Sequence, residues 1–209
     1  MRRLILTLAL LLAAVSASAQ ISAGIGYSHS RDMTKIGTDG DFSLISLNGF
    51  TVGANYSLPI VEGLSFVPGL YYEFLAAAGA KEVSEHISMT GSLIEHYLQL
   101  PLTLQFGGEV ARSCRLFVFG GPTLSLGLAS TRTESLSVPN FISLGGKHNQ
   151  YEDGDYGRFD LMVGGGAGVD IYRIRVTVGY DWGLLNRNLS DDGDIRHRGH
   201  LLVGVGWVF

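Results

Sequence analysis

Apolar and polar or small residues alternate along most of this chain with a period of two. The C-terminal segment 201–209 is the clearest case, because five large apolar residues take every second position and small or apolar residues take the others. Such alternation predicts a β-strand, since successive side chains of a strand point to opposite faces of the sheet. A strand of a soluble protein usually has a polar outer face. Segment 201–209 lacks one, so it does not fit a soluble sheet.

The same alternation recurs in seven earlier segments, which gives eight predicted strands in all. Their lengths suit tilted membrane strands, which need about 9–11 residues. The connections alternate between short links and long loops, as periplasmic turns and outer loops do in outer-membrane barrels. The predicted strands cover 21–29, 49–58, 64–74, 94–106, 114–128, 160–171, 174–182 and 201–209, and the predicted long loops cover 30–48, 75–92, 129–157 and 184–199.

These patterns predict an all-β fold. It is an eight-stranded antiparallel up-and-down transmembrane β-barrel with short periplasmic turns and long extracellular loops. An even number of strands places both termini on the periplasmic side, and a closed sheet leaves no unpaired edge in lipid. Aromatic residues near the predicted strand ends are expected to form two girdles at the membrane interfaces. They are Tyr27, Phe50, Tyr72, Phe74, Tyr180, Trp182, Trp207 and Phe209.

The first 19 residues have the pattern of a secretory signal peptide. Two arginines are followed by an apolar run at 4–15 and by the small-residue cleavage pattern Ala17-Ser18-Ala19. The apolar run is shorter than the ~20 residues that a membrane helix needs. We therefore predict a signal peptide at 1–19, an outer-membrane β-barrel domain at 20–209, and localisation in the cell outer membrane.

Composition favours a membrane barrel over a soluble domain. Charged residues make up 16% of the chain and 29 of its 209 residues are Gly, whereas soluble domains average about 25% charged residues. Removal of Arg2 and Arg3 with the signal peptide leaves 13 basic residues against 19 acidic ones, a net charge of −6. This balance argues against nucleic acid as a partner. The single Cys114 cannot form an internal disulfide.

The predicted inward-facing positions carry both acidic and basic side chains. An eight-stranded barrel is filled by its own side chains, and buried charges are costly unless they are paired. We therefore predict that Arg175 pairs with one of three aspartates, and that the interior forms a structural plug of salt bridges rather than an open pore. The candidate interior polar cluster consists of Glu95, Gln99, Arg115, Asp160, Asp170, Arg175 and Asp181, and the three aspartates are its candidate partners for Arg175.

Three prolines, Pro68, Pro101 and Pro122, fall near the middle of three consecutive predicted strands. Each removes one hydrogen bond from the ladder, because proline has no backbone N–H. Our hypothesis is that they cluster into one weak, bulged patch of the barrel wall.

No segment carries an enzyme or metal motif at the required spacing. Residues 191–194 with His197 and His200 resemble a Ca²⁺ loop but lack the distal bidentate carboxylate, so we interpret them as a solvated acidic loop. A lipid-acting enzyme would need a Ser and a His at one rim, and spacing leaves only an arrangement such as Ser84 with His86 open. We predict no catalytic residue, no metal, no cofactor and no enzymatic activity.

Four motifs taken together resemble one known family. They are Phe66-Val67-Pro68-Gly69-Leu70-Tyr71, Leu98-Gln99-Leu100-Pro101-Leu102, Phe119-Gly120-Gly121-Pro122 and Tyr180-Asp181-Trp182-Gly183-Leu184-Leu185-Asn186. In this order they resemble the PorT-like outer-membrane β-barrel family of Bacteroidetes, over nearly the whole mature chain. The resemblance implies an eight-stranded outer-membrane barrel without catalytic residues, and in some members a role in protein secretion or gliding. The final strand ending in Phe209 also resembles the signature that the barrel-assembly machinery recognises.

Three functions stay open at this point. The first is a non-enzymatic envelope protein with a structural or loop-mediated binding role. The second is an accessory component of a secretion or gliding system, and the third is a narrow porin for small solutes. The expected partners are outer-membrane lipid, the barrel-assembly machinery during biogenesis, and an envelope or secretion-system protein. We expect a monomer.

Overall fold

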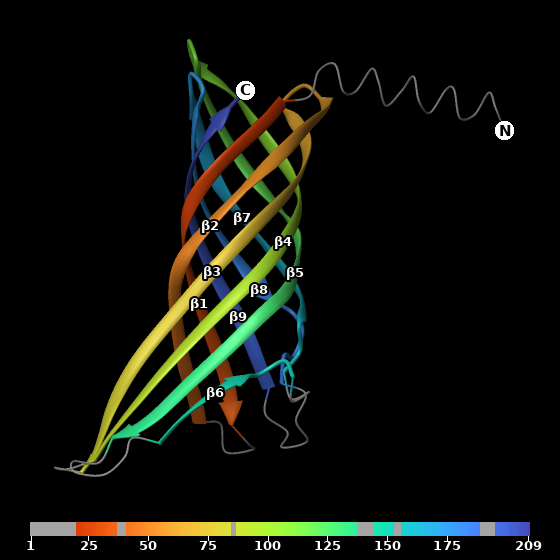
Figure 1. The fold of residues 1–209 in the computed structure, drawn as a ribbon. Helices are drawn as coiled ribbons and strands as arrows, with labels where there is room; N and C mark the ends of the chain where they lie inside the picture. The colour runs from red at the N-terminus through yellow and green to blue at the C-terminus, as the bar shows by residue number, and fades with distance from the viewer. Residues whose placement is uncertain (1–19, 37–40, 85–86, 138–143, 153–155, 189–194) are drawn as a thin grey trace, which may run out of the picture.

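The structure, a computed structural model, is a closed antiparallel barrel whose strands run up and down between two ends (Figure 1). It describes residues 20–36, 41–84, 87–137, 144–152, 156–188 and 195–209. The eight strands of the barrel are β1 (Gln20–Ile36), β2 (Asp41–Val61), β3 (Leu64–Ser84), β4 (Ile87–Ala111), β5 (Cys114–Ser137), β7 (Phe159–Ile171), β8 (Ile174–Gly183) and β9 (Ile195–Val208). A ninth, short strand, β6 (Leu144–Asn149), pairs only with β5 in the described part of the chain.

The predicted eight-stranded up-and-down fold is confirmed by the pairing of the strands. Each barrel strand pairs antiparallel with the next one along the chain, and β1 pairs with β9 to close the barrel. Three tight turns lie at the same end as both termini, and we take this as the periplasmic end. Gly63, Ser113 and Tyr172 occupy these turns with positive φ angles of 79°, 64° and 56°. Only Gly63 adopts such an angle without a steric cost.

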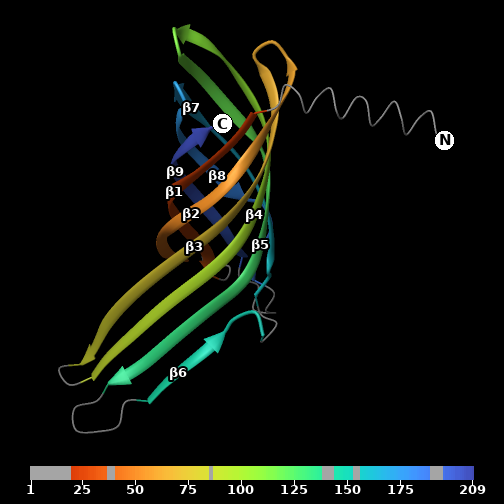
Figure 2. The same ribbon diagram turned by 45° about the horizontal axis from the view of Figure 1, so that its top comes forward.

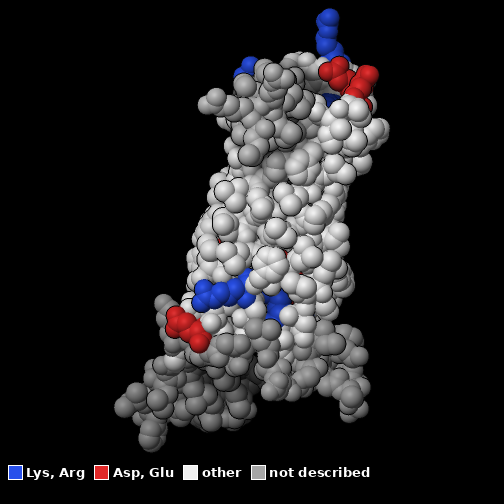
Figure 3. Space-filling view, turned by 90° about the vertical axis from the view of Figure 1, so that its right-hand side faces the viewer, with Lys and Arg blue, Asp and Glu red and all other residues white. Residues whose placement is uncertain are grey.

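The outside of the barrel is an apolar band. Exposed large apolar residues alternate with inward-facing ones on every barrel strand, as in Ile25, Val176 and Val205. Figure 3 shows one face almost free of charged side chains between a group near each end of the barrel. Exposed aromatic residues lie toward both ends of the band, for example Trp182 toward the outer end and Trp207 near the periplasmic end. This arrangement is typical of a barrel in lipid.

Among the described residues, no helix is long and apolar enough to cross a membrane.

The predicted bounds of the long loops are wrong, because strands extend into each of them. Strands β1 and β2 leave only 37–40 between them, and β3 and β4 leave only 85–86. Segment 129–157 contains the end of β5 and all of β6, and segment 184–199 contains the start of β9. The physical reason is that a hydrogen-bonded ladder can continue into water, where neither face needs apolar side chains. Hydrophobic alternation therefore stops before the strands do.

The outer end of the barrel is asymmetric. The β2–β3 ladder ends at Asn48 and Ala76, whereas the β3–β4 ladder continues to Ser84 and Ile87. Strand β5 parts from β7 at Leu126 and pairs with β6 farther out. The outer parts of β3, β4 and β5 (76–84, 87–94 and 130–137) together with β6 form a four-stranded sheet, here called the outer sheet, which leans away from the barrel axis (Figures 1 and 2).

The strand pairing is interrupted beside each of the three prolines. In three neighbouring strand pairs, the ladder leaves two residues of each strand unpaired. The register is the same on both sides of every gap. The gaps lie between Asn55–Gly69 and Leu58–Phe66, between Pro68–Leu102 and Tyr71–Gln99, and between Pro101–Thr123 and Leu104–Gly120. These gaps, here called the proline seam, agree with the hypothesis of a clustered weak patch. The predicted bulge is wrong, since the register does not shift there.

Candidate functional site in the barrel interior

The candidate site is the polar interior, which the structure divides into two clusters separated by a cavity. The outer cluster lies toward the extracellular end and takes side chains from β1, β3, β4 and β9 and from the segments that flank β7 and β8. The periplasmic cluster lies near the short turns and is centred on Arg175.

Glu73 is the centre of the outer cluster and is fully buried. One of its oxygens accepts hydrogen bonds from Arg198 Nη2 and Gln99 Nε2, both at 2.5 Å. Its other oxygen lies 2.7 Å from His200 Nε2 and accepts the Ser28 hydroxyl. Four strands are therefore joined through one carboxylate in the middle of the lumen.

Arginines stacked on tyrosine rings extend the outer cluster. The Arg198 guanidinium lies 4.2 Å from the centre of the Tyr97 ring. Arg187 lies 5.2 Å from the Tyr97 ring and 4.5 Å from the Tyr156 ring, and Arg196 lies 4.9 Å from Tyr156. Such contacts contribute about 2 kcal/mol or more where both groups are desolvated. They hold three arginines across the lumen in one layer.

Asp32 balances part of this positive charge. Its carboxylate lies 3.0 Å from Arg196 Nη2 and 3.7 Å from Arg187 Nη1. The Tyr156 hydroxyl donates to it at 3.2 Å. Burial raises the pKa of Tyr156 well above its ordinary value, so this hydroxyl stays protonated and keeps donating.

An apolar layer adjoins the outer cluster at the same end. Leu47, Leu75 and Leu93 are buried and form one contact cluster with Tyr97. Charged pairs and packed leucines together fill the lumen at this level, so the outer cluster is built as a plug.

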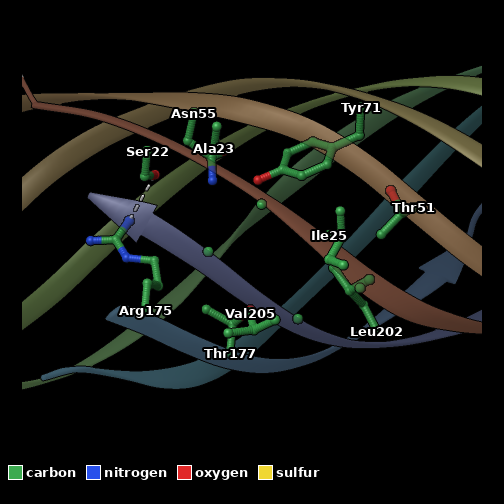
Figure 4. A pocket seen from close by; sticks show the side chains of 14 residues that line it. Ser22, Ala23, Ile25, Thr51, Asn55, Tyr71, Arg175, Thr177, Leu202 and Val205 are labelled. Atoms are coloured by element: carbon green, nitrogen blue, oxygen red, sulfur yellow. Dashed lines mark hydrogen bonds between the residues drawn. The ribbon is translucent and has the colours of Figure 1, made fainter. Parts of the chain in front are cut away.

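The periplasmic cluster is smaller. Arg175 makes a bidentate salt bridge to Asp170, with Nε–Oδ1 and Nη2–Oδ2 distances of 2.7 and 2.8 Å. Its guanidinium lies 4.8 Å from the Phe117 ring, and Nη1 donates to the Ser22 hydroxyl at 3.4 Å. Figure 4 shows Arg175 pointing toward Ser22, with Tyr71 on the facing side of the cavity. The sequence predicted Asp160, Asp170 or Asp181 as the partner, and the structure contains the pair with Asp170.

Space between the two clusters is limited. A cavity of about 90 Å³ reaches from Arg175 and Phe117 to Asp181 and His200. A smaller cavity of about 50 Å³ adjoins it (Figure 4). A much larger recess, of about 790 Å³, lies at the periplasmic end and is lined by turn residues and Arg115.

The predicted candidate residues do not form one cluster. Arg115, Asp170 and Arg175 lie at the periplasmic end, where Arg115 stands opposite Asp170 in the β5–β7 register. The other four lie toward the outer end. There Gln99 donates to Glu73, Glu95 accepts from Ser130, Asp181 lies 3.8 Å from His200 Nδ1, and Asp160 is buried beside Gly183.

Several central residues were not in the predicted cluster. Glu73 falls in the predicted strand 64–74 but was not assigned to the site, and the others were placed in loops. These others are Asp32, Tyr156, Arg187, Arg196, Arg198 and His200. A signal existed for four of them: positions 28, 30 and 32 of β1, and 196, 198 and 200 of β9, have the same parity as the inward-facing residues nearer the termini.

His200 does not belong to an acidic loop, contrary to the sequence interpretation. It lies in β9, buried in the lumen, with Nε2 at 2.8 Å from Ser28 Oγ. Residues 191–194 and His86 lie outside the described residues, as does the side chain of Ser84. Within the described part of the chain, no three His, Cys, Asp or Glu side chains gather to hold a metal ion.

Ser28, His200 and Asp181 have the order of a nucleophile, a base and an orienting acid, but their surroundings oppose catalysis. Glu73 occupies both the Ser28 hydroxyl and His200 Nε2, so the imidazole is not free to take the serine proton. Ser28 has no exposed surface. The arrangement is therefore better explained as part of the plug.

The family model of the outer membrane protein beta-barrel domain matches residues 16–187. No curated protein matches the chain. Several solved structures are similar, all at low identity, and their names describe different activities. They include Ail, the attachment invasion locus protein of Yersinia pestis (17% identity, 91% of this chain and 97% of that chain, TM-score 0.41), Neisserial surface protein A (11%, 92% and 99%, 0.43) and the outer membrane protease OmpT from Escherichia coli (9%, 91% and 96%, 0.30).

Proposed function

The chain belongs to the outer membrane protein beta-barrel domain family and lies in the outer membrane, and from this premise we propose that it is a non-enzymatic barrel with a closed lumen that binds an envelope or extracellular partner through its outer end. The observation that carries this proposal is the outer cluster. It joins β1, β3, β4 and β9 through Glu73, Arg198 and their neighbours at the level where a solute would have to pass. Binding at the outer end is supported by the outer sheet, which the lumen does not need for closure.

Planar bilayers test the closed lumen. The folded chain, inserted from detergent, is expected to produce no steady conductance steps, because paired charges and packed leucines fill the outer end. Regular single-channel steps would favour the narrow porin instead and would remove the closed-lumen proposal.

Cross-linking on intact cells tests the binding role. A variant without residues 79–91 loses the tip of the β3–β4 hairpin but keeps the ladder from the Ala77–Leu93 pair inward, with Ala78 and Ser92 left as a two-residue turn. We expect this variant to fold, as judged by heat-dependent gel migration, and to lose the cross-linked partner of the wild type. An unchanged partner would contradict binding through the outer sheet.

An accessory role in secretion or gliding is the second candidate, and it includes the PorT-like, Bacteroidetes-type assignment. It is favoured by the periplasmic end, where Ile60, Val61 and Val110 are more than half exposed beside the recess of about 790 Å³. Apolar side chains at this position suit protein contacts on the periplasmic side. The test combines secretion by an Ile60→Asp/Val61→Asp variant with cross-linking of the wild type. Normal secretion by the variant, together with no cross-link between the wild type and a secretion component, would remove this candidate.

A further inference from the structure

The outer sheet has an unpaired edge along β3. The β2–β3 ladder ends at Ala76, but β3 continues to Ser84 with β4 as its neighbour on the other side. Figures 1 and 2 agree that the outer part of β3 leans away from the β1–β2 hairpin. Among the described residues, no strand pairs with the outward edge of segment 77–84.

The backbone groups that this edge offers can be identified from the ladder below it. A Cβ atom built on Gly53 or Gly49 of β2 would collide with the carbonyl oxygen of Leu70 or Phe74, so these carbonyls point toward β2. In an antiparallel strand, the N–H and C=O of one residue point to the same side. Even-numbered residues of β3 therefore face β2. Since the β3–β4 register is unbroken through 82, Ala78 and Ala80 direct their N–H and C=O groups to the empty edge.

Over residues 76–80 this edge lacks the features that usually protect a sheet, and Lys81, Glu82 and a bulge follow only at its outer end. Natural edge strands are shortened, bulged, charged or interrupted by proline to prevent pairing with another chain. Residues 76–80 are Ala-Ala-Ala-Gly-Ala, with no charge and no proline, and the first bulge on β3 comes only at Glu82 and Ser84. Alanine and glycine are depleted in strands. A preference for strand structure therefore does not explain the run of small residues at 76–80. Small side chains do leave the backbone of this edge accessible to another strand.

We propose that this β3 edge binds an extended, uncharged segment of a partner polypeptide, which adds to the outer sheet as an antiparallel strand. The inference rests on the proposed function, since it names the kind of partner that the outer end binds. Strand addition obtains its affinity from main-chain hydrogen bonds. The neutral sequence at 76–80 and at 88–92 of the neighbouring strand gives no charge for a partner to match.

A second copy of the chain is a poorer occupant for this edge. The β3 strands of two copies in one membrane run in the same direction across it, so they cannot pair antiparallel with each other. Within the outer sheet, β6 of another copy runs in the opposite direction because it returns from the outer end after β5, and among the described residues it is paired on one side only. This pairing is retained as an outcome of the test.

The test uses the full chain in lipid nanodiscs and a library of short random peptides displayed on phage. Peptides enriched on the wild type are synthesised, and their affinities are measured for an Ala78→Pro/Ala80→Pro variant, which removes two edge N–H groups without touching the β4 ladder. The matched control is Ala78→Ser/Ala80→Ser, which keeps them. Two backbone hydrogen bonds of about 1 kcal/mol each predict a loss of roughly 10- to 30-fold in the proline variant and little change in the serine variant.

Two readouts separate the edge from other modes of binding. Bound peptide is expected to slow amide hydrogen exchange at Ala78 and Ala80, and the affinity is expected to persist in high salt. Equal affinity for both variants, or binding that salt abolishes, would overturn the β3-edge site. The site would also be overturned if the proline variant lost self-association but kept its affinity for the peptides. That result would assign the β3 edge to β6 of another copy. If the β3-edge site is overturned but a partner still cross-links on cells, the proposed function stands. A conducting lumen, in contrast, contradicts the proposed function and leaves the β3-edge site untouched.

Discussion

Glu73 and Arg198 form the most consequential ion pair in the described interior, because both side chains are fully buried. Arg198→Met would leave the Glu73 carboxylate with Ser28, His200 and Gln99 but without its guanidinium partner. Loss of one member of a buried pair costs about 3–5 kcal/mol. We expect the free energy of unfolding in urea, followed by gel migration in detergent, to fall by this amount.

The double variant Glu73→Gln/Arg198→Met is the control for that experiment. It removes both charges, so much of the lost stability should return. An Arg198→Met protein as stable as the wild type would show that the plug contributes nothing to folding.

Small residues at a few inward positions make room for large side chains. A Cβ at Gly166 would meet the Phe119 ring and the Val178 carbonyl, whereas a Cβ at Gly108 would meet nothing within 4 Å. Gly166→Ala is therefore expected to destabilise the barrel by about 1–3 kcal/mol through overpacking. Gly108→Ala, on β4, should leave the unfolding midpoint unchanged, and equal effects of the two variants would contradict the packing seen at Phe119.

At the scale of strands, the proline seam divides the wall into a weak and a strong side. The β7–β8 ladder runs without a gap from Met162 to Ile171. The β3–β4 and β4–β5 ladders each leave two residues per strand unpaired. Hydrogen exchange in lipid should therefore be faster for Gly69 and Leu102, whose N–H groups face the gaps, than for Val169 and Val176. Uniform protection across the barrel would mean that the gaps are bridged in solution.

The strands also define how far the sequence could predict the fold. Strands β7 and β8 were predicted to within two residues, because lipid on one side and packed glycines on the other leave a strong alternation. The outer halves of β3, β4 and β5 were missed, since both of their faces leave the lipid. The pair of Arg175 with an aspartate followed from charge balance alone, but the choice of Asp170 depends on register.

The outer cluster could be predicted only in part for a related reason. Its members come from positions as far apart as Ser28 and His200, which only barrel closure brings together. Arg187 and Tyr156 lie outside regular strands, so no periodicity marks them as inward-facing.

At the scale of the whole molecule, orientation in the membrane can be read from one natural thiol. Cys114 is half-buried next to a short turn at the periplasmic end. A membrane-impermeant maleimide should label it only after the outer membrane is permeabilised. In a Cys114→Ala/Ala78→Cys variant, the reagent should label intact cells, because Ala78 is exposed on the outer sheet. Labelling of Cys114 but not of Ala78→Cys on intact cells would mean that the barrel has the opposite orientation in the membrane.

The position of Glu73 and Arg198 on β3 and β9 has a consequence for the order of assembly. They are 125 residues apart, and Ser28 and His200 are 172 apart, so no early hairpin can neutralise these charges. Until β9 docks against β1, the carboxylate and the guanidinium must stay hydrated, and the half-built sheet cannot dehydrate its outer end. Docking of the last strand then joins the charges and expels their water in one event. The plug is thus completed after the barrel closes, so its interactions are absent from the folding transition state. Its loss should therefore speed unfolding far more than it slows folding.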